Sequence, residues 1–357
     1  MRQSMALLMK GNEAIAEAAI QAGCRLFYGY PITPSTEIPE YMAKKMKTAG
    51  GTYLQAESEV AAIYMVFGAG AVGERVMTGT SSPGFSLMQE GLSYLFAAEI
   101  PCVIVNVMRG GPGLGGLGPT QADYFQLTKG GGHGDYHAIV IAPSSVQEMV
   151  NLTKEAFDLA DYYRNLVIVA VDGILGQMME PVEFPPSEGR KLEPKTWAAN
   201  GAEGRPKNNV ISYYLTPEIG EVENKRWGDK MSLIKENEQR FVEYEMDDAE
   251  YAFVAFGTSA RITESAVDML REEGIKVGLY RPVTLWPFPE KGLLARVNQV
   301  KGWMSIELSA GQMVEDVQLA INGQAPVGFY GRQGGMTPEP EEVVAAFKAQ
   351  LLGGAQI

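Results

Sequence analysis

The chain has 357 residues, of which 46% are hydrophobic and 20% are charged, and its formal net charge is −13. This composition is typical of a globular protein with two domains that each bury their own core. The acidic balance argues against nucleic acid as a partner, because binding to phosphates needs a basic surface. The sequence contains neither an apolar run of the ~18–20 residues needed to cross a bilayer nor the pattern of a signal peptide. We therefore expect a cytoplasmic protein that does not bind a membrane.

Residues 1–180 alternate β-rich runs with helical patterns, which predicts a parallel sheet covered by helices on both faces. The first 20 residues are expected to form a strand edge followed by a helix. The other predicted strands lie at residues 25–30, 52–55, 75–79, 102–107, 138–142 and 167–171. The other predicted helices lie at residues 36–47, 58–72, 85–98 and 145–160.

The composition changes after residue 180. Residues 180–226 are rich in proline, glycine, asparagine and charge, which predicts an extended linker that wraps another subunit, followed by an amphipathic helix near residues 229–245. A second α/β unit is then predicted, with strands at 251–257, 277–280 and 303–307 and helices at 261–273, 311–321 and 341–352. We therefore expect one domain at 1–180, a linker at 181–248 and a second domain at 249–357.

Unusual segments follow the first four strands of the predicted sheet. They are residues 30–35, 56–59, 80–84 and 109–116. Because ligands bind beyond the carboxyl ends of the strands in an open parallel sheet, these segments predict a binding site at one edge.

The first two segments each allow two interpretations. Thr33 lies between two prolines and has a fixed hydroxyl, but Ser35 or Thr36 could simply cap the next helix. Glu57 and Glu59 begin a strongly apolar helix, where a carboxylate stabilises the first turn. Alternatively, one of the two glutamates is partly buried and shares a proton with a ligand nitrogen.

Arg109 ends an apolar strand and precedes a glycine-rich loop. Its guanidinium could clamp a carboxylate, since glycines let the backbone approach a ligand closely, or it could be a surface arginine on a flexible loop.

Two other motifs do not indicate a cofactor site. Residues 68–73 match the dinucleotide-binding glycine pattern, but they close a helix instead of opening one, so we reject this reading. His133 and His137 lie among glycines, which favours a mobile or ligand-covering loop over a metal site.

Cys24 and Cys102 each lie alone in an apolar segment, which predicts core packing. Two distant thiols cannot ligate an iron–sulfur cluster, which needs about four.

Four motifs occur in a characteristic order. They are Tyr30-Pro-Ile-Thr-Pro-Ser35, Ser58-Glu-Val-Ala-Ala62, Thr80-Ser-Ser-Pro-Gly-Phe-Ser-Leu-Met88 and Met108-Arg-Gly-Gly-Pro-Gly-Leu-Gly115. With them the chain resembles, over nearly its whole length, the alpha-type subunits of 2-oxoacid:ferredoxin oxidoreductases. Residues 121–136 are most similar to the branched-chain (2-oxoisovalerate) members, and the 2-oxoglutarate members are near relatives.

The resemblance implies an α/β fold. It consists of a pyrimidine-type thiamine-diphosphate-binding parallel-sheet domain followed by a transketolase C-terminal-like α/β domain, to which residues 256–259 and 280–288 are similar.

The resemblance also implies roles for individual residues. Glu59 would hydrogen-bond N1′ of the aminopyrimidine and so favour the imino tautomer, whose nitrogen removes the C2 proton of the thiazolium. The resemblance, and not residue chemistry, favours Glu59 over Glu57. Thr33 would lie beside the substrate carboxylate or the cofactor, and Arg109 would bind that carboxylate. Four further residues would contact the pyrimidine: Pro31, Thr80, Ser81 and Phe85.

The implied reaction is oxidative decarboxylation of a 2-oxoacid to acyl-coenzyme A and CO2, with electrons passing to ferredoxin. The chain lacks a Gly-Asp-Gly…Asn motif for magnesium diphosphate, and Val171-Asp-Gly173 is the nearest approach. The resemblance therefore implies a heteromer with a beta-type chain that binds Mg²⁺ and diphosphate, a gamma-type chain, and a ferredoxin-like delta-type chain with [4Fe-4S] clusters.

Three alternatives remain open at this point. A 2-oxoglutarate enzyme would need a further cation near the distal carboxylate, whereas a branched-chain substrate needs an apolar pocket. A transketolase-like or lipoamide-dependent dehydrogenase chain would use related thiamine chemistry without iron. A non-catalytic scaffold subunit would keep the fold with a vacant pocket.

Overall fold

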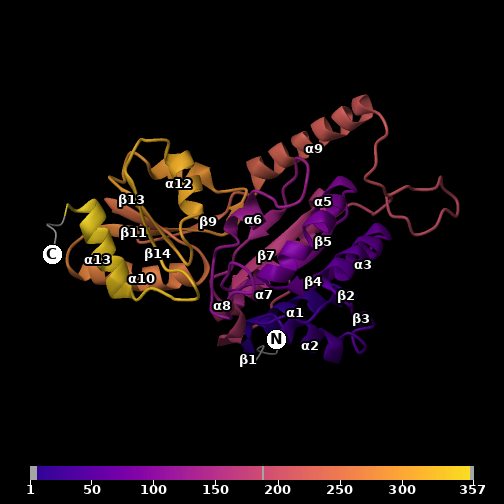
Figure 1. Ribbon diagram of the computed structural model, residues 1–357, viewed down its shortest axis with the longest axis horizontal. Coiled ribbons are helices and arrows are strands. Elements are labelled where there is room, and N and C mark those ends of the chain that lie inside the picture. The colour runs from indigo at the N-terminus through magenta and orange to yellow at the C-terminus, as the bar shows by residue number, and fades with distance from the viewer. Residues whose placement is uncertain (1–5, 187–188, 354–357) are drawn as a thin grey trace.

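The structure is a computed structural model that describes residues 6–186 and 189–353. It has two lobes, one built around a seven-stranded sheet and the other around a five-stranded sheet (Figure 1). Within the described residues, no helix is both long enough and apolar enough to span a membrane.

The seven-stranded sheet forms the first lobe and has the order β12-β6-β7-β5-β4-β2-β3. Its strands from the first half of the chain are all parallel to one another, as the sequence predicted. They are β2 (Leu26–Gly29), β3 (Thr52–Gln55), β4 (Val76–Thr80), β5 (Cys102–Met108), β6 (Ile139–Ile141) and β7 (Leu166–Asp172). The central strands β5 and β7 are apolar and fully buried, because helices cover both faces of the sheet.

The first lobe contains eight helices in its described residues. They are α1 (Gly11–Gln21), α2 (Glu37–Lys45), α3 (Glu59–Ala71), α4 (Ser82–Leu87), α5 (Gln89–Ala97), α6 (Tyr124–Thr128), α7 (Val146–Tyr163) and α8 (Gly173–Gln177). A small antiparallel pair, β1 (Leu7–Lys10) with β8 (Met179–Val182), lies beside them. The single helix predicted over residues 85–98 is in fact two helices, which meet at Met88.

The seventh strand of this sheet comes from the second half of the chain. β12 (Thr284–Trp286) pairs antiparallel with β6. The Trp286 ring stacks on the His137 ring, with centroids 4.5 Å apart. The sequence did not predict this strand, because a three-residue element carries too little periodicity to be recognised.

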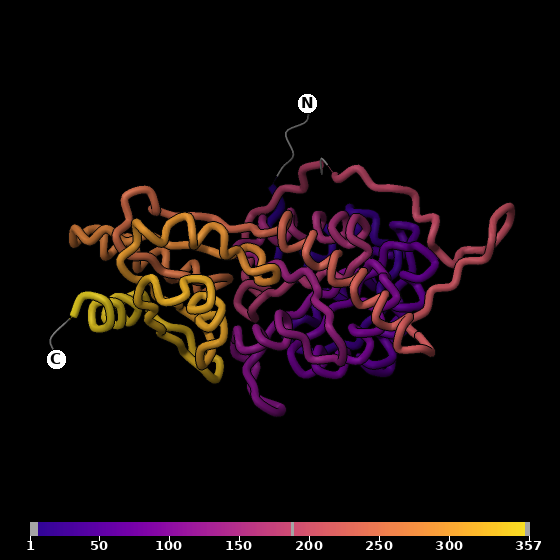
Figure 2. Tube along the Cα trace, turned by 90° about the horizontal axis from the view of Figure 1, so that it is seen from above, coloured from indigo at the N-terminus to yellow at the C-terminus, as the bar shows by residue number. Residues whose placement is uncertain are grey.

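The linker differs from the prediction at its end. The segment at 189–216 has no helix or strand and runs over the outside of the first lobe (Figure 2). α9 (Pro217–Asn237) begins 12 residues before the predicted start at residue 229, with a proline in its first turn. Only Trp227 and Ile234 are buried in it, so its apolar pattern is weak. The predicted helical end is wrong, because residues 241–244 form β9 (Phe241–Tyr244).

The second lobe has the strand order β14-β13-β10-β11-β9, in which only β9 is antiparallel. Its other strands are β10 (Tyr251–Val254), β11 (Val277–Pro282), β13 (Trp303–Glu307) and β14 (Val327–Gly331). Its helices are α10 (Gly257–Glu272), α11 (Glu290–Arg296), α12 (Met313–Ile321) and α13 (Pro340–Leu351). The sequence did not predict β14 or α11.

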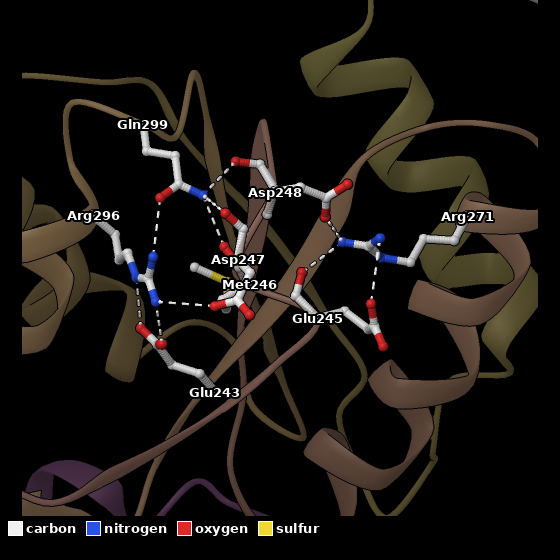
Figure 3. A network of polar contacts seen from close by, with 9 residues as sticks. Glu243, Glu245, Met246, Asp247, Asp248, Arg271, Arg296 and Gln299 are labelled. Atoms are coloured by element: carbon white, nitrogen blue, oxygen red, sulfur yellow. Dashed lines mark hydrogen bonds and ion pairs between the residues drawn. The ribbon is translucent and has the colours of Figure 1, made fainter.

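A polar network fastens the turn after β9 to this lobe (Figure 3). Arg296 pairs with Glu243 at 2.6 Å, and Arg271 pairs with Asp248 at 2.7 Å. The Gln299 amide donates to the Met246 carbonyl at 2.8 Å. The end of the linker is therefore part of the second lobe.

Buried hydrogen bonds join the two lobes. The Gln121 amide donates to the Phe256 carbonyl at 2.7 Å and accepts from the Ser259 hydroxyl at 2.6 Å. The Asp172 carboxylate accepts from the backbone N–H and the hydroxyl of Thr258 at 2.8 and 2.6 Å. Because these groups are fully or almost fully buried, the contact between the lobes is specific and not a loose surface encounter.

Candidate functional site

The structure brings the four unusual segments together at the carboxyl edge of the first sheet. The guanidinium of Arg109, after β5, donates to the Thr33 carbonyl, after β2, at 2.8 Å. The Arg109 backbone N–H donates to the Ser82 hydroxyl, after β4, at 3.0 Å. Gly84, in the same β4 segment, packs directly on the Glu59 carboxylate, after β3. The segments therefore form one contiguous site.

The two glutamates differ sharply in burial. Glu59 is the first residue of α3 and is only 5% exposed, whereas Glu57 is exposed. Ser58 caps the helix by accepting from the Ala61 N–H at 3.2 Å, so neither glutamate is needed as the cap. Among the described residues, none donates a hydrogen bond to the Glu59 carboxylate. A buried carboxyl without an internal partner is typical of a group that meets a ligand.

Gly84 explains how the site closes around Glu59. A Cβ at Gly84 would overlap Oε1 of Glu59 and Oγ1 of Thr80. Only glycine therefore lets the backbone of the 80–84 segment pass over the carboxyl, and this close approach keeps the carboxyl buried.

Arg109 is not a surface arginine on a flexible loop. It is 8% exposed, its Nη1 donates to Thr33 and its Nη2 lies 3.4 Å from the Leu114 carbonyl. Its Nε is buried and has no partner among the described residues. The guanidinium is therefore held in one orientation, and one N–H on each terminal nitrogen remains for an anionic ligand.

The other candidate residues fall into two groups. Thr80, Ser81 and Phe85 are fully buried within the chain, and the Ser81 hydroxyl has no partner among the described residues. Pro31 and Thr33 are exposed. The alternative reading of residues 30–35 as a helix cap is not supported, because neither Ser35 nor Thr36 caps α2 through its side chain.

Sequence reasoning missed a buried polar cluster behind Arg109. The Asp123 carboxylate accepts from the Ser82 hydroxyl at 2.6 Å and from the Asn106 amide at 2.8 Å. Burial raises the pKa of Asp123, although both hydrogen bonds act in the opposite direction. One signal was available, since Asn106 is an amide in an otherwise apolar strand and needs a buried partner.

A cavity of about 470 Å³ opens beside this cluster, between the two lobes. The first lobe contributes Ser82, Asp123 and the 109–113 segment, and the second lobe contributes the 308–310 segment, among others. Arg109 is the only cationic side chain among the described residues that line it.

The two histidines take part in packing. His133 contacts the Ser93 hydroxyl at 3.3 Å, and His137 contacts the Thr128 carbonyl at 2.9 Å. Burial lowers the pKa of His137. In the described part of the chain, no three His, Cys, Asp or Glu side chains are grouped so that they could hold a metal ion.

Both cysteines are buried, as predicted, and are free thiols. Burial raises the pKa of Cys24 and of Cys102 to about 12, so both thiols are protonated at neutral pH and act as core residues.

Comparison with known families covers most of the chain. Residues 17–246 match the family described as pyruvate flavodoxin/ferredoxin oxidoreductase, thiamine diphosphate-binding. Residues 249–343 match pyruvate:ferredoxin oxidoreductase core domain II.

Individual relatives agree with these matches. The chain is 48% identical over 337 residues to ketoisovalerate oxidoreductase subunit VorB of Methanothermobacter marburgensis, covering 94% of this chain and 96% of that protein. It is 38% identical over 363 residues to 2-oxoglutarate synthase subunit KorA of Methanocaldococcus jannaschii, covering 95% of this chain and 98% of that protein.

Solved structures show the same likeness. The 2-oxoglutarate:ferredoxin oxidoreductase from Magnetococcus marinus, with 2-oxoglutarate, coenzyme A and succinyl-CoA bound, superposes with a TM-score of 0.87 at 28% identity, covering 98% of this chain and 66% of that longer chain. A split-gene transketolase, an inactive beta4 tetramer, superposes with a TM-score of 0.61 at 13% identity over 98% of this chain and 99% of that chain, which shows the fold alone.

The family match and the two-lobed fold therefore define a thiamine-diphosphate-binding α/β protein with a transketolase-like fold. The chain belongs to the 2-oxoacid:ferredoxin oxidoreductase family, as one of its alpha-type subunits. The resemblance, the fold class and the oxidoreductase activity predicted from the sequence motifs are thereby confirmed.

Proposed function

We propose that this chain supplies the aminopyrimidine-binding half of the active site in a complex that oxidatively decarboxylates a branched-chain 2-oxoacid. The observation that carries the proposal is the Glu59 carboxyl, which is buried at the sheet edge without a hydrogen-bond partner in the described part of the chain. When bound, thiamine diphosphate supplies the nucleophilic carbon and the electron sink for loss of CO2. Glu59 holds the proton that is shared with N1′ of the pyrimidine ring.

Arg109 and Thr33 have complementary roles in this proposal. Arg109 binds the carboxylate of the 2-oxoacid through the two terminal N–H groups that its backbone partners leave free. Thr33 fixes the guanidinium through its carbonyl, and Thr33 itself is exposed. Pro31, Thr80, Ser81 and Phe85 form or back the wall of the pyrimidine site.

A branched-chain substrate is supported by the surroundings of Arg109. A 2-oxoglutarate site needs a second cation for the distal carboxylate. The cavity beside Arg109 offers no such group among its described lining residues. The relative that carries the name ketoisovalerate oxidoreductase is also more similar to this chain than the 2-oxoglutarate synthase relative, at 48% against 38% identity.

Diphosphate and Mg²⁺ are proposed to bind a beta-type chain. The nearest approach to the missing diphosphate motif contains Asp172, but this carboxylate is fully engaged by Thr258 and by the Leu175 N–H at 3.2 Å. Asp172 therefore holds the two lobes together and has no free oxygen to offer a metal.

The electron path is proposed to lie in a ferredoxin-like delta-type chain with [4Fe-4S] clusters, and a gamma-type chain completes the complex. The sequence has two cysteines in all, and both are buried core residues. An iron–sulfur cluster needs about four thiolates, so its ligands have to come from another chain.

The complex purified with its partners tests the proposal. Turnover is measured with several 2-oxoacids in the presence of coenzyme A and ferredoxin. We expect the highest kcat/KM for a branched-chain 2-oxoacid and reduction of ferredoxin only when coenzyme A is present. A higher kcat/KM for 2-oxoglutarate would reassign the substrate, and lack of turnover with every 2-oxoacid would contradict the catalytic role.

A further inference from the structure

The Arg109 backbone is held by a serine from the neighbouring strand end. Ser82 is the first residue of α4, and its hydroxyl lies 3.0 Å from the Arg109 N–H and 2.6 Å from the Asp123 carboxylate. A hydroxyl has one proton and two lone pairs, and the shorter contact to a carboxylate takes the proton. Ser82 is thereby oriented so that it accepts from Arg109.

Asp123 fixes this orientation. It is 8% exposed, and the same oxygen, Oδ2, accepts both the Ser82 hydroxyl and the Asn106 amide. Asn106 lies on β5, three residues before Arg109, so the cluster ties the strand to the segment after β4. Each member of the cluster is buried, so bulk water competes little with these hydrogen bonds.

The second lobe in turn fixes Asp123. On one side of it, the Gln121 amide is bound by Ser259 and by the Leu308 N–H at 3.0 Å. On the other side, the Tyr124 hydroxyl donates to Asp316 at 2.6 Å. The segment that carries Asp123 is therefore anchored to the second lobe at two points that flank the carboxylate.

We propose that Ser82 and Asp123 are positioning residues that set the place of Arg109, and that the second lobe acts on the substrate site through them. The proposal rests on the proposed role of Arg109 in binding the 2-oxoacid carboxylate. It predicts that the cluster affects binding of the 2-oxoacid and leaves binding of coenzyme A and ferredoxin unchanged.

The test uses the complete complex with Ser82→Ala. We expect the KM for the 2-oxoacid to rise about tenfold, as for a lost binding interaction, while kcat falls less than about threefold and the KM for coenzyme A is unchanged. Ser93→Ala is the matched control: Ser93 is also buried, but its hydroxyl donates to the Glu90 carbonyl of its own helix at 2.8 Å. A KM in Ser82→Ala equal to that of the control overturns the proposal.

Two variants of Asp123 separate positioning from general damage to the fold. Asp123→Asn keeps an oxygen that can accept both hydrogen bonds, so its KM for the 2-oxoacid should stay within about threefold of the wild type. Asp123→Ala removes both bonds and should resemble Ser82→Ala. Equal KM values for the two Asp123 variants would contradict the proposal. If Asp123→Ala does not assemble, the KM values of the Ser82→Ala and Asp123→Asn complexes still test the proposal.

A double variant shows whether Ser82 acts through Arg109. Arg109→Lys alone should raise the KM for the 2-oxoacid. Adding Ser82→Ala to it should change the KM little, because both changes act on the same contact between the Arg109 guanidinium and the 2-oxoacid carboxylate. Additive effects would show that Ser82 acts elsewhere and would overturn the positioning role. An unchanged KM in Arg109→Lys would instead refute the proposed function of Arg109, so the two failures are distinguishable.

Discussion

Gly84 packs on the Glu59 carboxyl so closely that any side chain at this position would overlap Oε1. The segment after β4 thus covers the first turn of α3. It keeps Glu59 buried at a strand end, where ligands bind in parallel sheets. A Cβ at Gly84 would also overlap Oγ1 of Thr80, which lies in the same segment. The burial of Glu59 is therefore a property of two segments that are distant in sequence.

Glu59→Gln should abolish most of the turnover of the complex. The glutamine amide does not ionise and so cannot exchange a proton with the pyrimidine nitrogen, and the loss of a positioned acid–base group costs on the order of 10²–10⁴-fold in rate. Initial rates of ferredoxin reduction measure the effect, with size-exclusion chromatography to confirm assembly.

Glu57→Gln is the control for Glu59→Gln, because Glu57 is two residues away and exposed. Its rate should stay close to that of the wild type. Unchanged turnover in Glu59→Gln would favour a scaffold role for the chain and would remove the basis of the proposed function.

Gly118→Ala should destabilise the contact between the lobes. A Cβ at Gly118 would lie 2.6 Å from the Cα of Gly335, and Gly335 has a φ of +92°, so neither backbone has room to move freely. The overlap should cost about 1–3 kcal/mol and lower the thermal unfolding midpoint. Gly116→Ala, in the same loop, has nothing within 4 Å of its Cβ and should change the midpoint little. Equal midpoints for the two variants would contradict the packing seen here.

Glu148→Gln should destabilise the chain in a pH-dependent manner. Glu148 of α7 pairs with Arg281 of β11 through both carboxylate oxygens, at 2.6 and 3.0 Å. Burial by itself would raise the pKa of Glu148, but the pairing with Arg281 and the hydrogen bonds from Ser144 together hold this pKa below its ordinary value. We expect a loss of about 1.5–3 kcal/mol in the free energy of unfolding at pH 7.

The sign of the pH dependence follows from the lowered pKa. The stabilisation by Glu148 is present above the unfolded-state pKa of about 4.3 and is lost as the pH falls through the lower pKa of the folded state. The free energies of unfolding of the wild type and of Glu148→Gln, measured between pH 7 and pH 3, should therefore converge at the acidic end. Glu221→Gln, which breaks an exposed pair with Lys225 in α9, should change the free energy by less than about 1 kcal/mol throughout. A constant difference for Glu148→Gln at every pH would refute the assignment.

Replacing both cysteines should leave the iron content of the complex unchanged. Cys24 and Cys102 are buried thiols, so the double alanine variant loses about 1 kcal/mol of packing per site but no cluster ligand. Iron per mole of complex, measured by atomic absorption, should equal that of the wild type. Loss of iron in an assembled complex would place a cluster in this chain and contradict the proposal that the clusters lie in a delta-type chain.

Much of the fold follows from the sequence because its strands are continuous apolar runs. β13 is fully buried and has the predicted bounds, and β3 has them too although its side chains are mostly exposed. Two other elements with largely exposed side chains were misplaced. α9 and β9 belong to this group, because solvent imposes no pattern on the residues that face it.

The sequence by itself placed Thr33, Glu59 and Arg109 at the carboxyl ends of strands of one sheet, since parallel strands bring those ends to one edge. Only the tertiary structure showed that Glu59 is buried while Glu57 is exposed, and it revealed Asp123 behind Ser82. Burial and hydrogen bonding depend on contacts between segments up to hundreds of residues apart, and no local pattern of residues encodes such contacts.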